Sequence, residues 1–356
     1  MGNALREQQT AQGAVFEVGL AVPVTYGNEQ AARQAVATGV ALCDRTHWGR
    51  LRVADSDRLR FLHNQTTNQI QTLQPGQGCR TVFVNSTART IDLVTAYVEA
   101  DSVLLLTSPG QATKLMEWMD RYIFFADKVK LTNETDTTVA FTLLGPKSAD
   151  CLARLGIDLP AELPAASHQR ITVNDVEVLL TAGSGLTIPG FTLIAAAEFG
   201  SQLWQALSEA TAVPMGDRLW QTLRIEQGRP MPGAELTEDY NPLEATLWQA
   251  VSFNKGCYIG QEIIARLQTY QGLRQQLWGL RLAEPVDPGT PVMLDTNKVG
   301  VVTSCVATDE GAIALGYIRT RAGGAGLSVM VGDRPAEVVD IPFATRGYLG
   351  EQETSK

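Results

Sequence analysis

Apolar residues that recur every three or four positions mark a helix in the middle of the chain. Between residues 111 and 124, Leu115, Trp118, Met119 and Tyr122 follow this spacing, which predicts an amphipathic helix. Further helices are predicted over residues 31–39, 146–155, 201–210, 217–227 and 261–267, and after Ser56, which suits a helix N-cap.

Runs of apolar and β-branched residues mark the strands. In the first part of the chain we expect strands over residues 49–53, 81–84, 93–99, 103–107, 138–144, 171–181 and 191–195. Strands and helices that are intermixed in this way indicate the α+β class. From Leu277 onward only short strands are predicted, over residues 277–282, 299–306, 312–317 and 327–331. Gly, Pro, Asp and Asn separate them, which predicts a small all-β barrel or sandwich.

The length of 356 residues requires two or three domains, because a single core seldom grows so large. We expect an α+β domain over residues 1–140, a second α+β domain over 141–272 and a β-barrel domain over 273–350. The formal net charge of −9 argues against broad nucleic-acid binding, which needs a basic surface. The first twelve residues are polar, and no apolar stretch approaches the roughly 20 residues that span a bilayer. We therefore expect a cytoplasmic protein without a membrane partner.

Five scattered cysteines include one in an unusual setting. No C-x-x-C pair exists, so the sequence predicts no local metal site. Cys257 lies in the run K-G-C-Y-I-G-Q-E over residues 255–262, two residues after Lys255 and just before a predicted helix. A lysine and a helix N-terminus both favour the thiolate, and Gly256 and Gly260 permit positive φ and a close approach of another molecule. The alternative is a turn that happens to contain a cysteine.

Two carboxylates are candidate ligand contacts. Glu226 lies near a helix end in R-I-E-Q-G-R, where it could accept two hydrogen bonds from a flat amidine-like edge. The alternative is a surface ion pair with Arg224 or Arg229. Asp92 opens an apolar strand and could hold a ligand amine, or it could cap a turn of its own backbone.

Arginines form two further candidate features. Arg266 follows Glu262 by four residues, so it could pair with it on a helix or meet an anionic ligand beside the thiol. A second group could attract an anionic tail or a phosphate backbone, although a solvated face of a strand and helix is the preferred interpretation. Its members are Arg45, Arg50, Arg52, Arg58 and Arg60.

The octapeptide resembles the signature K-G-C-Y-x-G-Q-E of the YgfZ family, the folate-binding relatives of the glycine-cleavage T-protein. Shorter segments resemble the same superfamily in chain order: D-R-T-x-x-G from Asp44, the helix end F-L-H-N-Q-T-T-N from Phe61, R-Y-I-F-F-A-D from Arg121, and Gly145-Pro146. The resemblance implies a multi-domain ring of the T-protein/YgfZ type with a C-terminal small β-barrel, and makes residues 1–140 a folate-binding domain.

The resemblance also implies a function. A YgfZ-like protein would bind tetrahydrofolate or a derivative and support assembly or repair of iron–sulfur enzymes, including those that modify tRNA. Cys257 would be the working thiolate and Lys255 its activator. Folate contacts would come from Glu226, Asp92, Arg266 and Tyr122.

An aminomethyltransferase of the glycine-cleavage type is the alternative. The T-protein usually lacks a cysteine at the position of Cys257 and carries an Asp-Asp pair after a Gly-Gly turn. Here residues 88–93 read A-R-T-I-D-L, so one aspartate and both glycines are absent. This departure favours the YgfZ-like interpretation. A folate-binding regulator without chemistry is a third possibility.

Overall fold

The computed structural model describes residues 3–160 and 163–349, which divide into two compact units. The first unit comprises Met1–Leu62, Ile70–Cys79 and Val94–Gln221, and the second comprises His63–Gln69, Arg80–Leu93 and Thr222–Lys356. The units are interleaved along the chain. The expected boundaries at residues 140 and 272 therefore stay a prediction.

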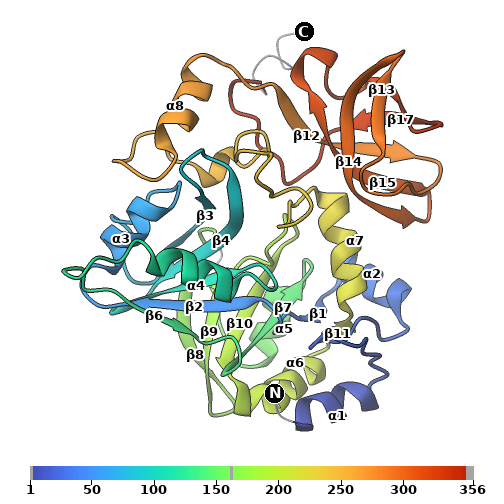
Figure 1. Ribbon diagram of the computed structural model, residues 1–356. Helices are drawn as coiled ribbons and strands as arrows, with labels where there is room; N and C mark the ends of the chain where they lie inside the picture. Colours follow the sequence, from blue (N-terminus) through green and yellow to red (C-terminus); the bar gives the residue numbers. More distant parts are fainter. Residues whose placement is uncertain (1–2, 161–162, 350–356) are drawn as a thin grey trace. The chain divides into compact units, whose positions relative to one another are not determined.

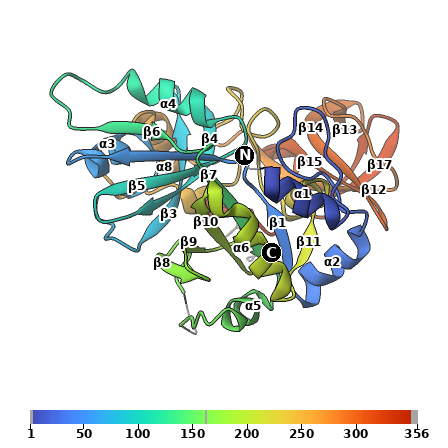
Figure 2. The same ribbon diagram turned by 90° about the horizontal axis from the view of Figure 1, so that it is seen from below.

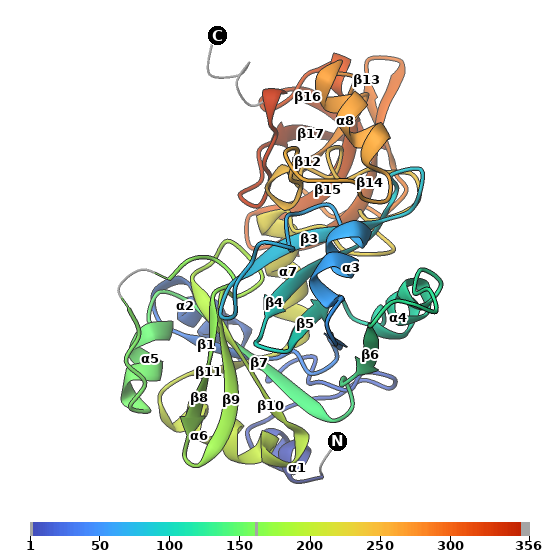
Figure 3. The same ribbon diagram turned by 90° about the vertical axis from the view of Figure 1, so that its left-hand side faces the viewer.

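The first unit contains a six-stranded sheet with the order β11-β1-β7-β10-β9-β8 (Figures 1 and 3). Its strands are β1 (Ala41–Asp44), β7 (Thr138–Leu144), β8 (His168–Val173), β9 (Val176–Ala182), β10 (Gly190–Ala196) and β11 (Val213–Met215). Strand β1 pairs with β11 in parallel and with β7 antiparallel. The helical segments that accompany this sheet are α1 (Asn3–Ala11), α2 (Glu29–Thr38), α5 (Ser148–Arg154), η1 (Ala197–Phe199) and α6 (Gly200–Glu209).

Apolar packing joins this sheet to its helices. Helices α1 and α6 lie side by side (Figures 1 and 2). Trp204 of α6 is fully buried and meets Phe141 of β7 edge to face, with 5.2 Å between the ring centroids. Leu5 of α1 belongs to the same buried cluster. Burial of large aromatic and aliphatic side chains is the main force that holds these layers together.

A second sheet has the order β3-β4-β5-β2-β6. Its strands are β2 (Gly49–Ala54), β3 (Gly78–Val84), β4 (Thr90–Val98), β5 (Ser102–Thr107) and β6 (Lys130–Asn133), and its neighbours in the chain are α3 (Arg58–Gln65) and α4 (Ala112–Asp120). Strand β3 ends in the second unit and strand β4 begins there, while their other ends belong to the first unit. The turn between them therefore carries its residues into the unit that also holds Cys257.

The second unit contains a closed six-stranded barrel with the order β12-β15-β14-β13-β16-β17 (Figure 1). The strands are β12 (Gln275–Leu282), β13 (Pro291–Leu294), β14 (Asn297–Thr308), β15 (Gly311–Arg319), β16 (Ser328–Val331) and β17 (Arg334–Val339), with η3 (Thr320–Ala322) after β15. Before the barrel come α7 (Asp217–Gln227), η2 (Trp248–Ala250) and α8 (Gln261–Thr269). The prediction of an α+β chain with a small C-terminal β-barrel is confirmed.

Several local predictions differ from the structure. The strand expected over residues 171–181 is a hairpin of β8 and β9, because Asn174 and Asp175 adopt positive φ and turn the chain. The helix expected over residues 111–124 ends at Asp120. The sequence did not predict six elements, because they are polar or too short to show a clear period. They are α1, β1, β6, β11, β13 and β17.

Candidate functional site

Cys257 lies exposed in the loop between η2 and α8, in the second unit. The loop is fixed by Lys255, whose side chain is buried. Its ammonium donates hydrogen bonds to the backbone oxygens of His63 (2.5 Å), Thr66 (2.6 Å) and Asn68 (2.7 Å). The three protons of the ammonium match these three acceptors. Lys255 thus binds the thiol loop to the C-terminal end of α3.

The partners of Lys255 differ from those expected of a thiol activator. Within residues 3–160 and 163–349, Cys257 forms no hydrogen bond or ion pair. The Lys255 ammonium lies 4.7 Å from the centroid of the Tyr258 ring, which adds a cation–π contact inside the loop. Ile259 donates its backbone N–H to the oxygen of Asn64 (3.1 Å). These contacts hold the loop in place and leave the thiol accessible.

The two glycines of the loop behave differently. Gly260 has φ +80°, and a Cβ there would lie 2.9 Å from the backbone oxygen of Asn85 and 3.0 Å from the Cα of Ala88. The positive φ and the close approach expected at Gly260 are both present, but the molecule that approaches is the β3–β4 turn of the same chain. The expectation of positive φ at Gly256 is wrong, because its φ lies outside the left-handed region.

His63 is a neighbour of the thiol loop that sequence analysis missed. Its side chain is buried, and its Nε2 lies 3.7 Å from the place where a Cβ of Gly256 would be. Burial, and secondarily the charge of Lys255, lower the pKa of His63, so the imidazole is neutral at neutral pH. A neutral imidazole can accept a proton from a nearby thiol or ligand. The only sequence signal was the F-L-H-N-Q-T-T segment, which is remote from Cys257 along the chain.

Asp92 and Glu226 both lie in the second unit. Asp92 is in β4 and is fully buried. The β3–β4 turn before it is capped by Asn85, whose Oδ1 accepts from the backbone N–H groups of Thr87 (3.0 Å) and Arg89 (2.9 Å).

Glu226 is half-buried near the end of α7. Its neighbour Arg224, considered as a surface partner, forms a buried ion pair with Glu235 (2.9 Å). Leu93 and Ile225, adjacent in sequence to Asp92 and Glu226, belong to one buried cluster. Strand β4 and helix α7 therefore pack on the same core, which brings both carboxylates to neighbouring elements.

The two remaining candidate contacts lie on different units. Arg266 is exposed on α8 in the second unit. Over the described part of the chain it forms no ion pair with Glu262, so the proposed intrahelical pair is absent. Tyr122 belongs to the first unit, where its ring lies 4.8 Å from that of Trp118.

The preferred interpretation of the arginine group as a solvated face is wrong for two of its five members. Arg45 and Arg50 are almost completely buried. The Arg45 guanidinium lies 3.6 Å from the centroid of the Trp48 ring and donates to the Ser184 oxygen (2.8 Å). Arg50 donates to the oxygens of Thr46 and Thr138.

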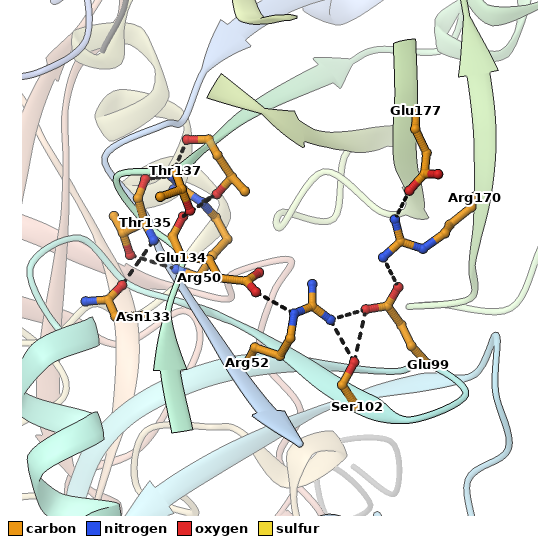
Figure 4. A network of polar contacts seen from close by, with 11 residues as sticks. Arg50, Arg52, Glu99, Ser102, Asn133, Glu134, Thr135, Thr137, Arg170 and Glu177 are labelled. Carbon is orange, nitrogen blue, oxygen red and sulfur yellow. Dashed lines mark hydrogen bonds and ion pairs between the residues drawn. The ribbon is translucent and has the colours of Figure 1, made fainter. Parts of the chain in front are cut away.

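Arg52 belongs to a chain of alternating charges (Figure 4). It binds Glu134 (2.6 Å) and also Glu99, which in turn pairs with Arg170 (2.5 Å). Arg60, which is exposed, pairs with Asp127 (3.1 Å). These arginines stabilise the first unit through carbonyls and carboxylates of the protein itself, and they form no open anion site.

The fold and the family are shown by comparison with known proteins. The family model described as the GCVT N-terminal domain matches residues 5–255, so the chain belongs to the GcvT family. Sequence identity is 41% to a protein of Arabidopsis thaliana named putative transferase, chloroplastic, over 94% of this chain and 78% of that protein. It is 31% to an aminomethyltransferase of Halalkalibacterium halodurans, over 92% of this chain and 93% of the relative.

A solved structure shows the same fold. The glycine cleavage system aminomethyltransferase T from Bartonella henselae superimposes with a TM-score of 0.85, covering 96% of this chain and 98% of that chain at 22% identity. The expected T-protein-type fold is thereby confirmed. In the described residues, no helix is long and apolar enough to cross a membrane.

Proposed function

We propose that this protein is a YgfZ-like member of the GcvT family, which binds tetrahydrofolate or a derivative and supports assembly or repair of iron–sulfur enzymes, including tRNA-modifying enzymes. The observation that carries the proposal is the exposed Cys257 on a loop anchored by a buried lysine. Three charge-assisted hydrogen bonds fix this loop and so hold the exposed thiol at a defined position. It favours a working thiol over a passive regulator.

Two carboxylates of the second unit support the proposal of pterin binding. Asp92 is a buried carboxylate in a strand, and Glu226 is half-buried on a helix that packs on the same core. Carboxylates in such settings can accept the N–H groups of a pterin edge. In this proposal Glu226 and Asp92 hold the pterin, while Arg266 is a further contact within the same unit. The folate would supply a carrier for one-carbon groups.

The thiol is tested by replacing Cys257 with serine. We expect the Cys257→Ser variant to fold and to bind tetrahydrofolate, but to lose complementation of a strain defective in iron–sulfur enzyme activity. The matched control is Cys79→Ser, a partly exposed cysteine of the first unit that should retain complementation. Full complementation by Cys257→Ser would reject the role of the thiol.

The folate contact is tested at Glu226. We expect Glu226→Ala to weaken tetrahydrofolate binding by about 1.5–3 kcal/mol, because charge-assisted hydrogen bonds are lost. Isothermal titration calorimetry measures this change, with Glu209→Ala on α6 of the first unit as control. An unchanged affinity in the Glu226 variant would remove it from the site.

Aminomethyl transfer is the second candidate, because a relative 31% identical over 92% of this chain is named aminomethyltransferase. An assay with an aminomethyl carrier and tetrahydrofolate separates the two functions. Transfer that persists in Cys257→Ser would favour this candidate, and absence of transfer in the intact protein would exclude it.

A further inference from the structure

An arginine-lined cavity lies within the second unit, formed by residues apart from the thiol loop. Its volume is about 730 Å³, in the range of pockets that hold small molecules. The lining residues are Arg89, Asp239, Glu244, Leu273, Arg274, Gln275, Arg319, Thr320 and Arg321. They come from the β3–β4 turn, the loop after α7, the segment that leads into β12, and the end of β15.

The barrel itself brings two of these segments together. Gln275 is the register partner of Arg319 in the β12–β15 pair, and the backbone N–H of Thr320 donates to the oxygen of Arg274 (2.9 Å). Arg274 and Arg321 flank these paired segments, Arg274 just before β12 and Arg321 in η3, so the backbones of all three arginines lie close together.

The cavity carries a surplus of positive charge. Four arginines line it against two carboxylates, a formal difference of 4 − 2 = +2, in a chain whose net charge is −9. Glu244 lies 3.8 Å from Arg89, which also donates to the backbone oxygen of Asp239 (2.8 Å). Glu244 also interacts with Gln275 and Arg274, so this carboxylate faces both Arg89 and Arg274.

The opposite side carries cations with no protein partner. Arg319 and Arg321 are exposed and form no ion pair or side-chain hydrogen bond with the residues that the structure describes. Between them, Thr320 also lines the cavity, and its hydroxyl has no hydrogen-bond partner in the same part of the chain. Arginines elsewhere in the molecule, such as Arg224 and Arg52, do have carboxylate partners.

We propose that this cavity binds a small molecule with two or more adjacent oxyanionic groups. A guanidinium offers two parallel N–H donors that match a phosphate or a carboxylate, and several guanidinium groups together match neighbouring oxyanions. Arg319 and Arg321 bind the oxyanions, and Arg89, Arg274 and Glu244 contact polar groups of the same ligand. None of the residues that line the cavity is Cys257 or one of the proposed folate contacts.

Titration calorimetry on the full-length protein tests the proposal, with pyrophosphate and citrate as probes and acetate as the single-charge comparison. We expect saturable one-to-one binding of pyrophosphate, citrate or both, at least tenfold tighter than acetate and weakened by added salt. Binding of pyrophosphate alone would identify a phosphate ligand, and binding of citrate alone would identify a polycarboxylate. Binding of both would show that the cavity recognises adjacent oxyanions of either kind.

The double variant Arg319→Gln/Arg321→Gln should weaken that binding at least tenfold. The control is Arg281→Gln, an exposed barrel arginine paired with Glu337, which should leave binding unchanged. Because all three side chains are exposed, these variants are expected to fold. Failure of both probes to bind below 10 mM, or equal binding by the double variant and the intact protein, would overturn the proposal.

Discussion

Lys255 shows how a single side chain can organise a candidate site. Its charge is buried, yet each of its N–H donors meets a backbone oxygen, so the cost of desolvation is offset by charge-assisted hydrogen bonds. Sequence analysis placed Lys255 beside Cys257 but assigned it to the thiol. The spacing could not reveal the acceptors, because they lie at residues 63–68, far away along the chain.

The first prediction concerns this lysine. Lys255→Met retains the side-chain length but removes all three donors, so we expect the free energy of unfolding to fall by about 3 kcal/mol. Urea unfolding measures the loss, and Lys298→Met, an exposed position on β14, should change it by less than about 0.5 kcal/mol. If Lys255→Met slows alkylation of Cys257 without lowering stability, the ammonium acts on the thiol instead.

At the scale of elements, the thiol loop depends on the β3–β4 turn. Helix α8 begins directly after Gly260, where an added Cβ would lie within 3.0 Å of Asn85 and Ala88 of that turn. The sequence predicted α7 with the observed bounds and α8 to within two residues, because apolar periodicity and flanking glycines are local signals. It could not predict that Arg45 and Arg50 are buried, since Ser184 and Thr138, which accept their hydrogen bonds, lie far along the chain.

Substitution of glycine in the loop gives a second prediction. Gly260→Ala combines the strain of a positive φ with a contact to backbone at 2.9 Å, and it should cost about 1–3 kcal/mol of stability. The matched control is Gly233→Ala, with φ +82° but no atom within 4 Å of the added Cβ, which should cost less. Thermal unfolding of both variants measures the difference. Equal losses would show that the turn does not constrain α8.

On the scale of the whole molecule, the fold class and the barrel followed from patterns that repeat over many residues, whereas the interleaving of the units did not. Short strands such as β1 and β11 pair in parallel across a long separation, which no local pattern encodes. The environment of a buried polar group likewise depends on residues from distant parts of the first unit. His47 is an example: it lies 3.5 Å from Asp217, and burial lowers its pKa to about 4.

A pH dependence follows from His47. Its pKa is 6.5 when unfolded and about 4 when folded, so the unfolded state binds the proton more tightly. Stability is therefore full above pH 6.5 and is lost as the pH falls towards 4, by roughly 3 kcal/mol for a shift of this size. Urea midpoints at pH 7 and pH 4.5 measure the loss, and His47→Gln should make it smaller. An equal loss in that variant would assign the effect to other groups.

The interleaved chain also constrains the order of events during synthesis. The backbone oxygens that accept hydrogen bonds from the Lys255 ammonium are synthesised long before residue 255. Segments 63–69 and 80–93 are therefore made before the remainder of the second unit, with which they pack. A nascent chain released before that point lacks the cation that secures these backbone oxygens. The thiol loop can therefore reach its final position only after synthesis has passed residue 262, and every shorter nascent chain lacks it.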